Sequence, residues 1–244
     1  MPSLKPYDRT LPYTYAPGAF PAMEAIRCCP GEVERLLIHS QARPELRDSL
    51  TQAAQAHGIR VEEADRALSR VSGKENCFAA AVVRKSALPM GAEEPHVVLH
   101  HPSDGGNLGT ILRSALGFGY RNVALIRPCA DPFDPRVIRA SMGAMFSLRV
   151  VQYDTMEEYR GDHPRHQLYP FMLTGSRSLL QVIDAGVPPL FALVFGNEGS
   201  GLPEDFAGMG QPVRIPMTDQ VDSLNLAIAA GVGMYAFAQT ALNG

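Results

Sequence analysis

The chain has 244 residues, of which 45% are hydrophobic and 19% charged, and its formal net charge at pH 7 is −3. That length is sufficient for a full hydrophobic core, either in one large domain or in a small domain joined to a medium one. The sequence has no apolar run long enough to span a membrane and its N-terminus has no signal-peptide core, so we expect a cytoplasmic protein without a membrane partner. A negative net charge is unlike that of a basic nucleic-acid-binding domain, so any RNA contact would depend on local basic patches.

The cysteines and histidines indicate no metal centre. The four cysteines, Cys28, Cys29, Cys77 and Cys129, form no C-x-x-C pair and have no histidine nearby at metal-ligand spacing. His163 and His166 lie in the polar stretch HPRH, and we expect both to be solvated rather than to bind an ion. We therefore expect neither a disulfide framework nor a metal.

The N-terminal third is expected to be a small α/β domain. A proline-rich leader over residues 1–17 is followed by the domain itself over 18–88. The predicted elements are helices at 20–27, 44–57 and 65–71 and strands at 33–39, 59–62 and 78–83. The stretch SALPMGAEEP, residues 86–95, has the proline, glycine and acidic composition of a linker.

The remainder, residues 95–244, alternates strands with helices. The predicted strands are 97–100, 122–126, 148–152, 168–173, 190–195 and 212–215, and the predicted helices are 107–117, 134–141, 155–160, 177–184 and 223–241. Alternation of this kind favours a mostly parallel sheet covered by helices on both faces.

The first candidate site block is SDGGNLGTILR, residues 103–113, directly after the apolar strand VVLHH. Asn107 is a suitable N-cap for the helix that follows, and Arg113 lies in the same helix. Free amides at a helix N-terminus together with an arginine suit a phosphate or a sugar hydroxyl. An ordinary capped helix with an exposed arginine is the alternative for this block taken alone.

Two further blocks follow. In FALVFGNEGSGL, residues 191–202, a buried strand ends at Gly196, and ligands bind beyond the carboxyl ends of parallel strands. In IPMTDQVDSLN, residues 215–225, a strand and polar loop lead to a helix that we expect to open at Asp222 or Ser223, with Asn225 in its first turn. Each block by itself is also compatible with a plain strand-to-helix turn or a capped helix.

Taken together and in this order, the three blocks resemble the three motifs of the SpoU/TrmH branch of the SPOUT methyltransferases. The resemblance implies transfer of a methyl group from S-adenosylmethionine to a ribose 2′-oxygen of RNA. It also implies an α/β catalytic domain with a C-terminal trefoil knot, and a homodimer. No Rossmann-type glycine fingerprint follows the first strand of this region, which is consistent with a different cofactor-binding fold.

The resemblance also implies roles for individual residues. A polar catalytic set would comprise Asn107, Arg113, Glu198 and Asn225. The cofactor would be held by Gly196, Asn197, Gly199, Ile215, Met217, Ser223 and Leu224. The family pattern makes Arg113 the general base, whereas a neutral arginine at pH 7 costs on the order of 7 kcal/mol. Glu198 is the simpler base on that ground, and the choice between the two stays open.

The sequence indicates less about the RNA substrate. Residues 18–83 resemble the RNA-binding module that precedes the catalytic domain in rRNA-directed members, which favours rRNA over tRNA. Arg136 and Arg139 lie three positions apart on a predicted helix and could contact RNA phosphates, as could Arg43, Arg47, Lys74, Arg84 and Lys85; a solvated face is the alternative. A tRNA-directed methyltransferase and a catalytically idle RNA- or ribosome-binding relative are the other functions that we consider.

Overall fold

The computed structural model describes residues 4–72, 77–174 and 177–242. The chain forms two compact units. The first comprises residues 1–86 and 131–147, and the second comprises 87–130 and 148–244. The two units are considered separately below.

The first unit is built on a four-stranded sheet in the order β1-β4-β2-β3. Its strands are β1 (Tyr13–Pro17), β2 (Val33–Ile38), β3 (Arg60–Glu63) and β4 (Ala79–Arg84), and its helices are α1 (Ala19–Cys28), α2 (Pro44–Ala56), α3 (Asp65–Ser72) and α5 (Pro135–Ala140), with short 3₁₀ turns η1 (Pro30–Glu32) and η2 (Ala144–Ser147). Alternate β4 residues divide the core: Ala81 packs with Ile26 of α1 and Leu50 of α2, whereas Val82 packs with Leu68 of α3. Both faces of the sheet are therefore covered.

The second unit has a five-stranded parallel sheet in the order β7-β6-β5-β10-β8. Its strands are β5 (His96–His100), β6 (Asn122–Ile126), β7 (Arg149–Tyr153), β8 (Gln167–Pro170) and β10 (Phe191–Phe195), and β9 (Arg177–Ser178) pairs with β11 (Val213–Arg214). The helices are α4 (Gly105–Gly117), α6 (Met156–Asp162), α7 (Leu179–Asp184), α8 (Leu226–Leu242) and the 3₁₀ turn η3 (Glu204–Gly208). This architecture confirms the expected α/β class with a mostly parallel sheet.

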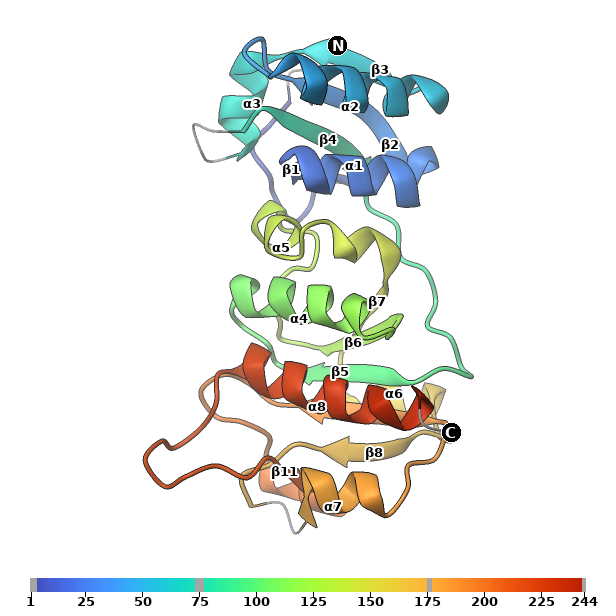
Figure 1. The fold of residues 1–244 in the computed structure, drawn as a ribbon, viewed down its shortest axis with the longest axis vertical. Helices are drawn as coiled ribbons and strands as arrows, with labels where there is room; N and C mark the ends of the chain where they lie inside the picture. Colours follow the sequence, from blue (N-terminus) through green and yellow to red (C-terminus); the bar gives the residue numbers. More distant parts are fainter. Residues whose placement is uncertain (1–3, 73–76, 175–176, 243–244) are drawn as a thin grey trace. The chain divides into compact units, whose positions relative to one another are not determined.

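Helices α4 and α8 lie side by side in the second unit (Figure 1). Helix α8 packs on β10 and β8 through aromatic rings: Phe237 meets Phe191 at a centroid distance of 5.2 Å and Tyr169 at 4.8 Å. Helix α8 can approach the sheet closely because it has a glycine, Gly233, against two other rings. A Cβ added at Gly233 would lie 2.6 Å from the Phe171 ring and 3.0 Å from the Phe195 ring. The small residues of α8 thus bring the helix down onto the strand that carries the candidate site.

Several element boundaries differ from those expected. Helix α8 begins at Leu226 rather than at Asp222 or Ser223, because Asn225 supplies the cap. Strand β8 ends at Pro170, and only Phe171 continues beyond it as an isolated bridge to Val213.

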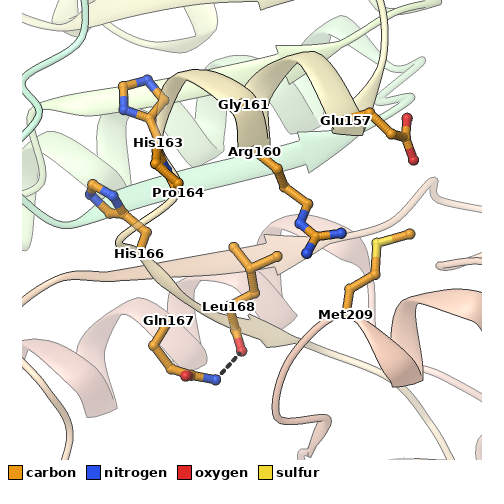
Figure 2. Close-up of a pocket in the computed structure, with 9 residues that line it drawn as sticks. All are labelled: Glu157, Arg160, Gly161, His163, Pro164, His166, Gln167, Leu168 and Met209. Atoms are coloured by element: carbon orange, nitrogen blue, oxygen red, sulfur yellow. Dashed lines mark hydrogen bonds between the residues drawn. The ribbon is translucent and has the colours of Figure 1, made fainter.

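The expectation that His163 and His166 are solvated is wrong. Their exposed fractions are only 9% and 7%, and both pack with the fully buried His96 at the start of β5. The two rings lie on the same side of the turn that follows α6 (Figure 2). Burial lowers the pKa of His96 to about 3 and also lowers that of His163, so the rings of His96 and His163 are neutral near pH 7. The polar sequence around them concealed a buried cluster.

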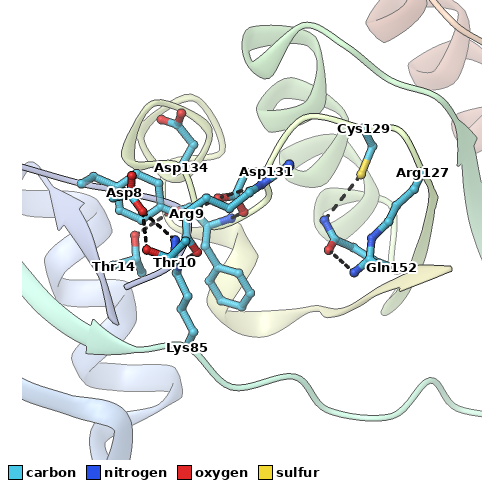
Figure 3. Close-up of polar contacts among 12 residues, drawn as sticks. Asp8, Arg9, Thr10, Thr14, Lys85, Arg127, Cys129, Asp131, Asp134 and Gln152 are labelled. Carbon is cyan, nitrogen blue, oxygen red and sulfur yellow. Dashed lines mark hydrogen bonds and ion pairs between the residues drawn. The ribbon is translucent and has the colours of Figure 1, made fainter. Parts of the chain in front are cut away.

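The chain is also divided differently from the expected domain boundaries. Residues 131–147 were expected in the C-terminal domain, but they contact the N-terminal segment: Thr14 donates to the carbonyl of Phe133, and Tyr7 donates to Asp131. Arg9 also pairs with Asp131 (Figure 3). The expected leader is likewise part of the fold, since β1 pairs antiparallel with β4. The first unit is therefore assembled from two separate stretches of sequence.

No helix in the described part of the chain is both long enough and apolar enough to cross a membrane.

Substitution of Gly233 with alanine should destabilise the protein by about 1–3 kcal/mol, because the added methyl group overpacks the contact between α8 and the two phenylalanine rings. The matched control is Gly231→Ala in the same helix, where an added Cβ meets nothing within 4 Å. That control should be neutral or stabilising by up to about 1 kcal/mol. Urea unfolding of both variants measures the difference, and equal effects would contradict the packing argument.

Candidate functional site

The site begins where β10 ends. All residues of β10 are buried, and the chain then reverses through Gly196–Gly201, where Asn197 and Gly201 exchange backbone hydrogen bonds of 3.1 and 3.0 Å. A Cβ on Gly196 would lie 2.1 Å from the carbonyl carbon of Gly201, and Gly201 itself has a φ of +68°. Glycine is therefore required at these positions by the tight turn itself.

Asn197 fixes the shape of this turn. Its Oδ1 accepts hydrogen bonds from the amides of Gly199 and Ser200, at 2.9 and 3.2 Å. Its Nδ2 donates to the carbonyl of His101, at 2.9 Å, just beyond the end of β5. Asn197 thus connects the glycine turn to the neighbouring strand, a bracing role in addition to its place in the pocket.

The carboxylate of Glu198 accepts hydrogen bonds from the loop that precedes α4. Oε2 accepts from the amide and hydroxyl of Ser103, at 3.0 and 2.8 Å, and Oε1 accepts from the amide of Asp104, at 3.0 Å. Asn107 Nδ2 lies 3.4 Å from Oε1, and Asn197 Nδ2 lies 3.2 Å from Oε2. Five donors therefore surround one carboxylate.

These contacts determine the charge of Glu198. Partial burial alone would raise its pKa, but the hydrogen bonds from the amides of Ser103 and Asp104 outweigh that effect and hold the pKa below the ordinary value of 4.5. Glu198 is consequently ionised at neutral pH. Its hydrogen-bonding capacity is, however, already used by the protein.

The first and third blocks meet at Asn107. Asn225 Nδ2 donates to Asn107 Oδ1 at 3.0 Å, while Asn225 Oδ1 accepts from the amide of Ala227 at 2.9 Å and so caps α8. Asn107 is not the N-cap of α4 as expected: Asp104 caps the helix by accepting from the Asn107 amide at 2.7 Å. This frees the Asn107 side chain to bridge Asn225 and Glu198.

Arg113 stands apart from this chain of hydrogen bonds. It lies on α4, its side chain is exposed, and it makes no hydrogen bond or ion pair with any described residue. The structure therefore joins Asn107, Glu198 and Asn225 in one network and leaves the guanidinium of Arg113 available to a ligand.

A pocket of about 510 Å³ opens beside the glycine turn. Its lining includes every residue that was expected to hold a cofactor: Gly196, Asn197, Gly199, Ile215, Met217, Ser223 and Leu224. Sequence reasoning missed the wall formed by Phe171–Thr174. That segment directly follows β8, the neighbour of β10, so the rule that ligands bind beyond the carboxyl ends of parallel strands could have identified it.

The lining of the pocket has both apolar side chains and polar groups. Apolar side chains such as Ile215, Leu224 and Leu226 can cover a base, and the glycine turn presents backbone groups. The volume falls within the range of about 300–1,000 Å³ that is usual for small-molecule and cofactor sites. S-adenosylmethionine likewise has an apolar part and a polar part.

The basic residues expected to contact RNA lie in the first unit. Arg136 pairs with Asp134 at 2.7 Å although its side chain is highly exposed, and Arg139 is on the same helix, α5. Arg47 and Arg84 pair with Glu63 and Glu32. Lys74 lies outside the described residues. Part of the positive charge that was expected to contact RNA is therefore paired with carboxylates of the protein itself.

Comparison with known proteins places the candidate site within one family. Residues 94–235 match the model of the SpoU rRNA Methylase family. An uncharacterised tRNA/rRNA methyltransferase of Synechocystis is 35% identical over 142 residues, which are 57% of this chain and 51% of that protein, so the chain covers about half of this relative's length.

Solved structures extend the likeness to nearly the whole chain. An AdoMet-bound rRNA methyltransferase from Sinorhizobium meliloti has a TM-score of 0.78 and 25% identity, with coverage of 95% of this chain and 88% of the other. A protein described for 2-OH methylation of C/U34 on tRNA has a TM-score of 0.57 and 29% identity, and it covers 63% of this chain and 100% of its own.

Replacement of Glu198 with glutamine should lower the free energy of unfolding by about 1–2 kcal/mol at pH 7, because an amide cannot accept from all the donors that the carboxylate gathers. The pKa of Glu198 is lowered by folding, so its contribution is present above pH 4.5 and is lost as the pH falls through the lowered value. The difference between wild type and variant should therefore shrink below pH 4.5. Urea unfolding across this pH range measures it.

The matched control is Glu204→Gln, an exposed carboxylate that lines the same pocket. It should leave stability nearly unchanged at every pH. A pH-independent difference for Glu198→Gln would contradict the carboxylate's role as an ionised acceptor.

Proposed function

This chain belongs to the SpoU rRNA Methylase family, and we propose that it is an S-adenosylmethionine-dependent RNA ribose 2′-O-methyltransferase that acts on rRNA. The observation that carries the proposal is the hydrogen-bonded chain Asn225–Asn107–Glu198 beside a pocket of cofactor size. It brings the three sequence blocks to one edge of the sheet, where a methyl donor and a ribose can meet.

Gly196, Asn197, Gly199, Ile215, Met217, Ser223 and Leu224 would hold the cofactor, since all of them line the pocket. When bound, S-adenosylmethionine supplies an electrophilic methyl group on a sulfonium. The turn that Gly196 closes presents backbone groups to this ligand. The apolar residues of the pocket, such as Ile215 and Leu224, would cover part of the bound cofactor.

The five donors around Glu198 weigh against its use as the general base, because a base must have a lone pair directed at the substrate hydroxyl. We assign Glu198 to positioning the loop from Ser103 to Asn107. Arg113, which has no protein partner among the described residues, is then the group that contacts the reacting ribose or its phosphate. Asn107 and Asn225 would orient the same nucleotide or hold the pocket's shape around it.

The choice of rRNA rests on the first unit. The rRNA methyltransferase of known structure matches 95% of this chain, whereas the protein described for tRNA methylation matches 63%. The small α/β module is thus shared with the former, and Arg136 and Arg139 on α5 are candidates for phosphate contact. A tRNA substrate remains the second candidate because the tRNA-associated structure matches over its entire length.

We further propose that the chain forms a homodimer and that its C-terminal segment is threaded as a trefoil knot, as the family resemblance implies. An apolar stripe on α8 supports the dimer: Ile228, Val232 and Tyr235 are 56%, 38% and 54% exposed, at the spacing of one helix face. Phe118, the residue directly after α4, lies edge-on to Tyr235 at a centroid distance of 5.8 Å and extends the stripe. Exposed apolar patches of this kind mark interaction surfaces.

Incubation with tritiated S-adenosylmethionine and total RNA from a strain lacking the gene should label one rRNA species. Label in tRNA would overturn the substrate assignment. Cofactor binding without transfer to any RNA would favour the catalytically idle, RNA-binding alternative.

Replacement of Arg113 with lysine should lower the single-turnover methylation rate by about 100-fold or more, because a planar, bidentate cation is lost next to the ribose. Cofactor affinity, measured by calorimetry, should stay within about threefold because Arg113 is not among the residues lining the pocket. Arg121→Lys, at an exposed arginine of the same unit, is the control and should retain the wild-type rate. A wild-type rate for Arg113→Lys would remove Arg113 from the mechanism.

Introduction of glutamate at Tyr235 should convert a dimer into a monomer, because a charge placed in a desolvated apolar contact costs several kcal/mol. Light scattering coupled to size exclusion reports the mass directly. Leu180→Glu is the matched control, since Leu180 is 67% exposed on α7, away from the stripe. A monomeric wild type, or a dimer that survives Tyr235→Glu, would contradict the assignment of this surface.

A further inference from the structure

Three buried histidines of the second unit lie together at the amino ends of its strands. His96 is the first residue of β5, and His163 and His166 occupy the turn between α6 and β8. The candidate methyltransferase site is at the opposite, carboxyl ends of the parallel strands β5 and β10. The cluster therefore does not belong to that site.

The geometry is that of a ligand set. Each histidine has one ring nitrogen that lies within 4.8 Å of a ring nitrogen of each of the other two. The His96 ring is 4.0 Å from that of His166 and 4.6 Å from that of His163, measured between centroids. Imidazole nitrogens gathered in this way suit zinc, copper, nickel or iron rather than magnesium or calcium, which prefer oxygen.

The hydrogen bonds around the cluster leave specific atoms available. His166 Nε2 is 2.9 Å from the carbonyl of Glu94, and His96 Nε2 is 2.8 Å from the carbonyl of Gly91. A carbonyl only accepts, so each of these nitrogens must carry the proton, and each Nδ1 then presents a lone pair. Ligating histidines are characteristically held in this way, with the second nitrogen donating to a carbonyl.

The Nδ1 atoms of His163 and His166 are buried and have no hydrogen-bond partner among the described residues. A buried polar atom without a partner costs about 1–3 kcal/mol, so these two atoms need an explanation. His163 Nε2 is 3.1 Å from the hydroxyl of Tyr153, which leaves its Nδ1 as the open position. A bound cation would satisfy both atoms at once.

We propose that His96, His163 and His166 form a binding site for one divalent transition-metal ion of the zinc type. Nδ1 of His163 and Nδ1 of His166 are two ligands, and His96 supplies the third from Nδ1 after exchanging its 2.9 Å contact with the Tyr159 hydroxyl for the metal. Zinc–nitrogen bonds of about 2.0–2.1 Å in a tetrahedral site require nitrogens about 3.3 Å apart, so the rings close on binding.

A water molecule would complete the coordination. His163 and His166 line a cavity of about 460 Å³, together with Glu157, Arg160 and Met209, and this cavity gives solvent access to the cluster (Figure 2). The metal would tie the turn after α6 to the start of β5, and so stabilise the edge strand β8 against the rest of the sheet. This role is independent of methyl transfer.

Titration of the metal-stripped 244-residue chain with Zn²⁺ and Co²⁺, followed by calorimetry and visible spectroscopy, tests the site. We expect one equivalent bound, a tetrahedral Co²⁺ spectrum without thiolate charge transfer, and a thermal midpoint raised by Zn²⁺ but not by Mg²⁺. The double variant His163→Ala/His166→Ala should lose at least about 100-fold in affinity. His166→Asn, a milder change, should weaken binding in the same direction if the double variant does not fold.

Two controls separate this site from others. His39→Ala/His57→Ala removes two histidines of the first unit, and Cys28→Ser/Cys29→Ser removes the adjacent thiols, and both should bind zinc as the wild type does. Absence of stoichiometric binding by the wild type, or unchanged affinity in the His163 and His166 variants, would overturn the proposal. Binding of S-adenosylmethionine by the variants confirms that they are folded and tests the proposed function separately.

Discussion

The carboxylate of Glu198 is the interaction on which the candidate site depends. It lies in the turn after β10 and accepts hydrogen bonds from the segment after β5, so one side chain holds together two parts of the chain that are some ninety residues apart. The donors lower its pKa and keep it charged, which strengthens every bond to it. Through Asn107 the same network reaches Asn225 and the start of α8.

The packing of β10 on both faces of its sheet supports this network. Residues of β10 alternate between the two faces of the sheet: Phe191 and Phe195 meet the aromatic side chains under α8, whereas Ala192 and Val194 pack with the cluster around Tyr159. Gly233 allows α8 to approach the sheet closely, and Asn225, the residue before the start of this helix, donates to Asn107. The glycines in the turn after β10 and Gly233 of α8 thus both permit close packing around the candidate site.

The two ends of the parallel sheet carry different chemistry. At the carboxyl ends, the glycine turn, the Glu198 carboxylate and Asn197 line a pocket of cofactor size. At the amino ends, three buried imidazoles lie among tyrosines and backbone carbonyls. Because strands in a parallel sheet all begin at one edge and end at the other, the sheet keeps these two groups apart by its own length.

The amino-acid sequence by itself determined the class of fold, because alternating strands and helices leave few arrangements other than a covered parallel sheet. The resemblance of the three sequence blocks to a known family also named seven residues that line the pocket, but not the wall formed by residues 171–174. Tertiary structure alone decided the rest. Whether Glu198 has a free lone pair depends on donors from a distant loop, and the grouping of residues 131–147 with the first unit depends on contacts such as Thr14 with Phe133. The burial of His163 and His166 was hidden for the same reason: the polar residues around them describe the chain locally, whereas their burial depends on packing with distant residues such as His96, some seventy residues earlier in the sequence.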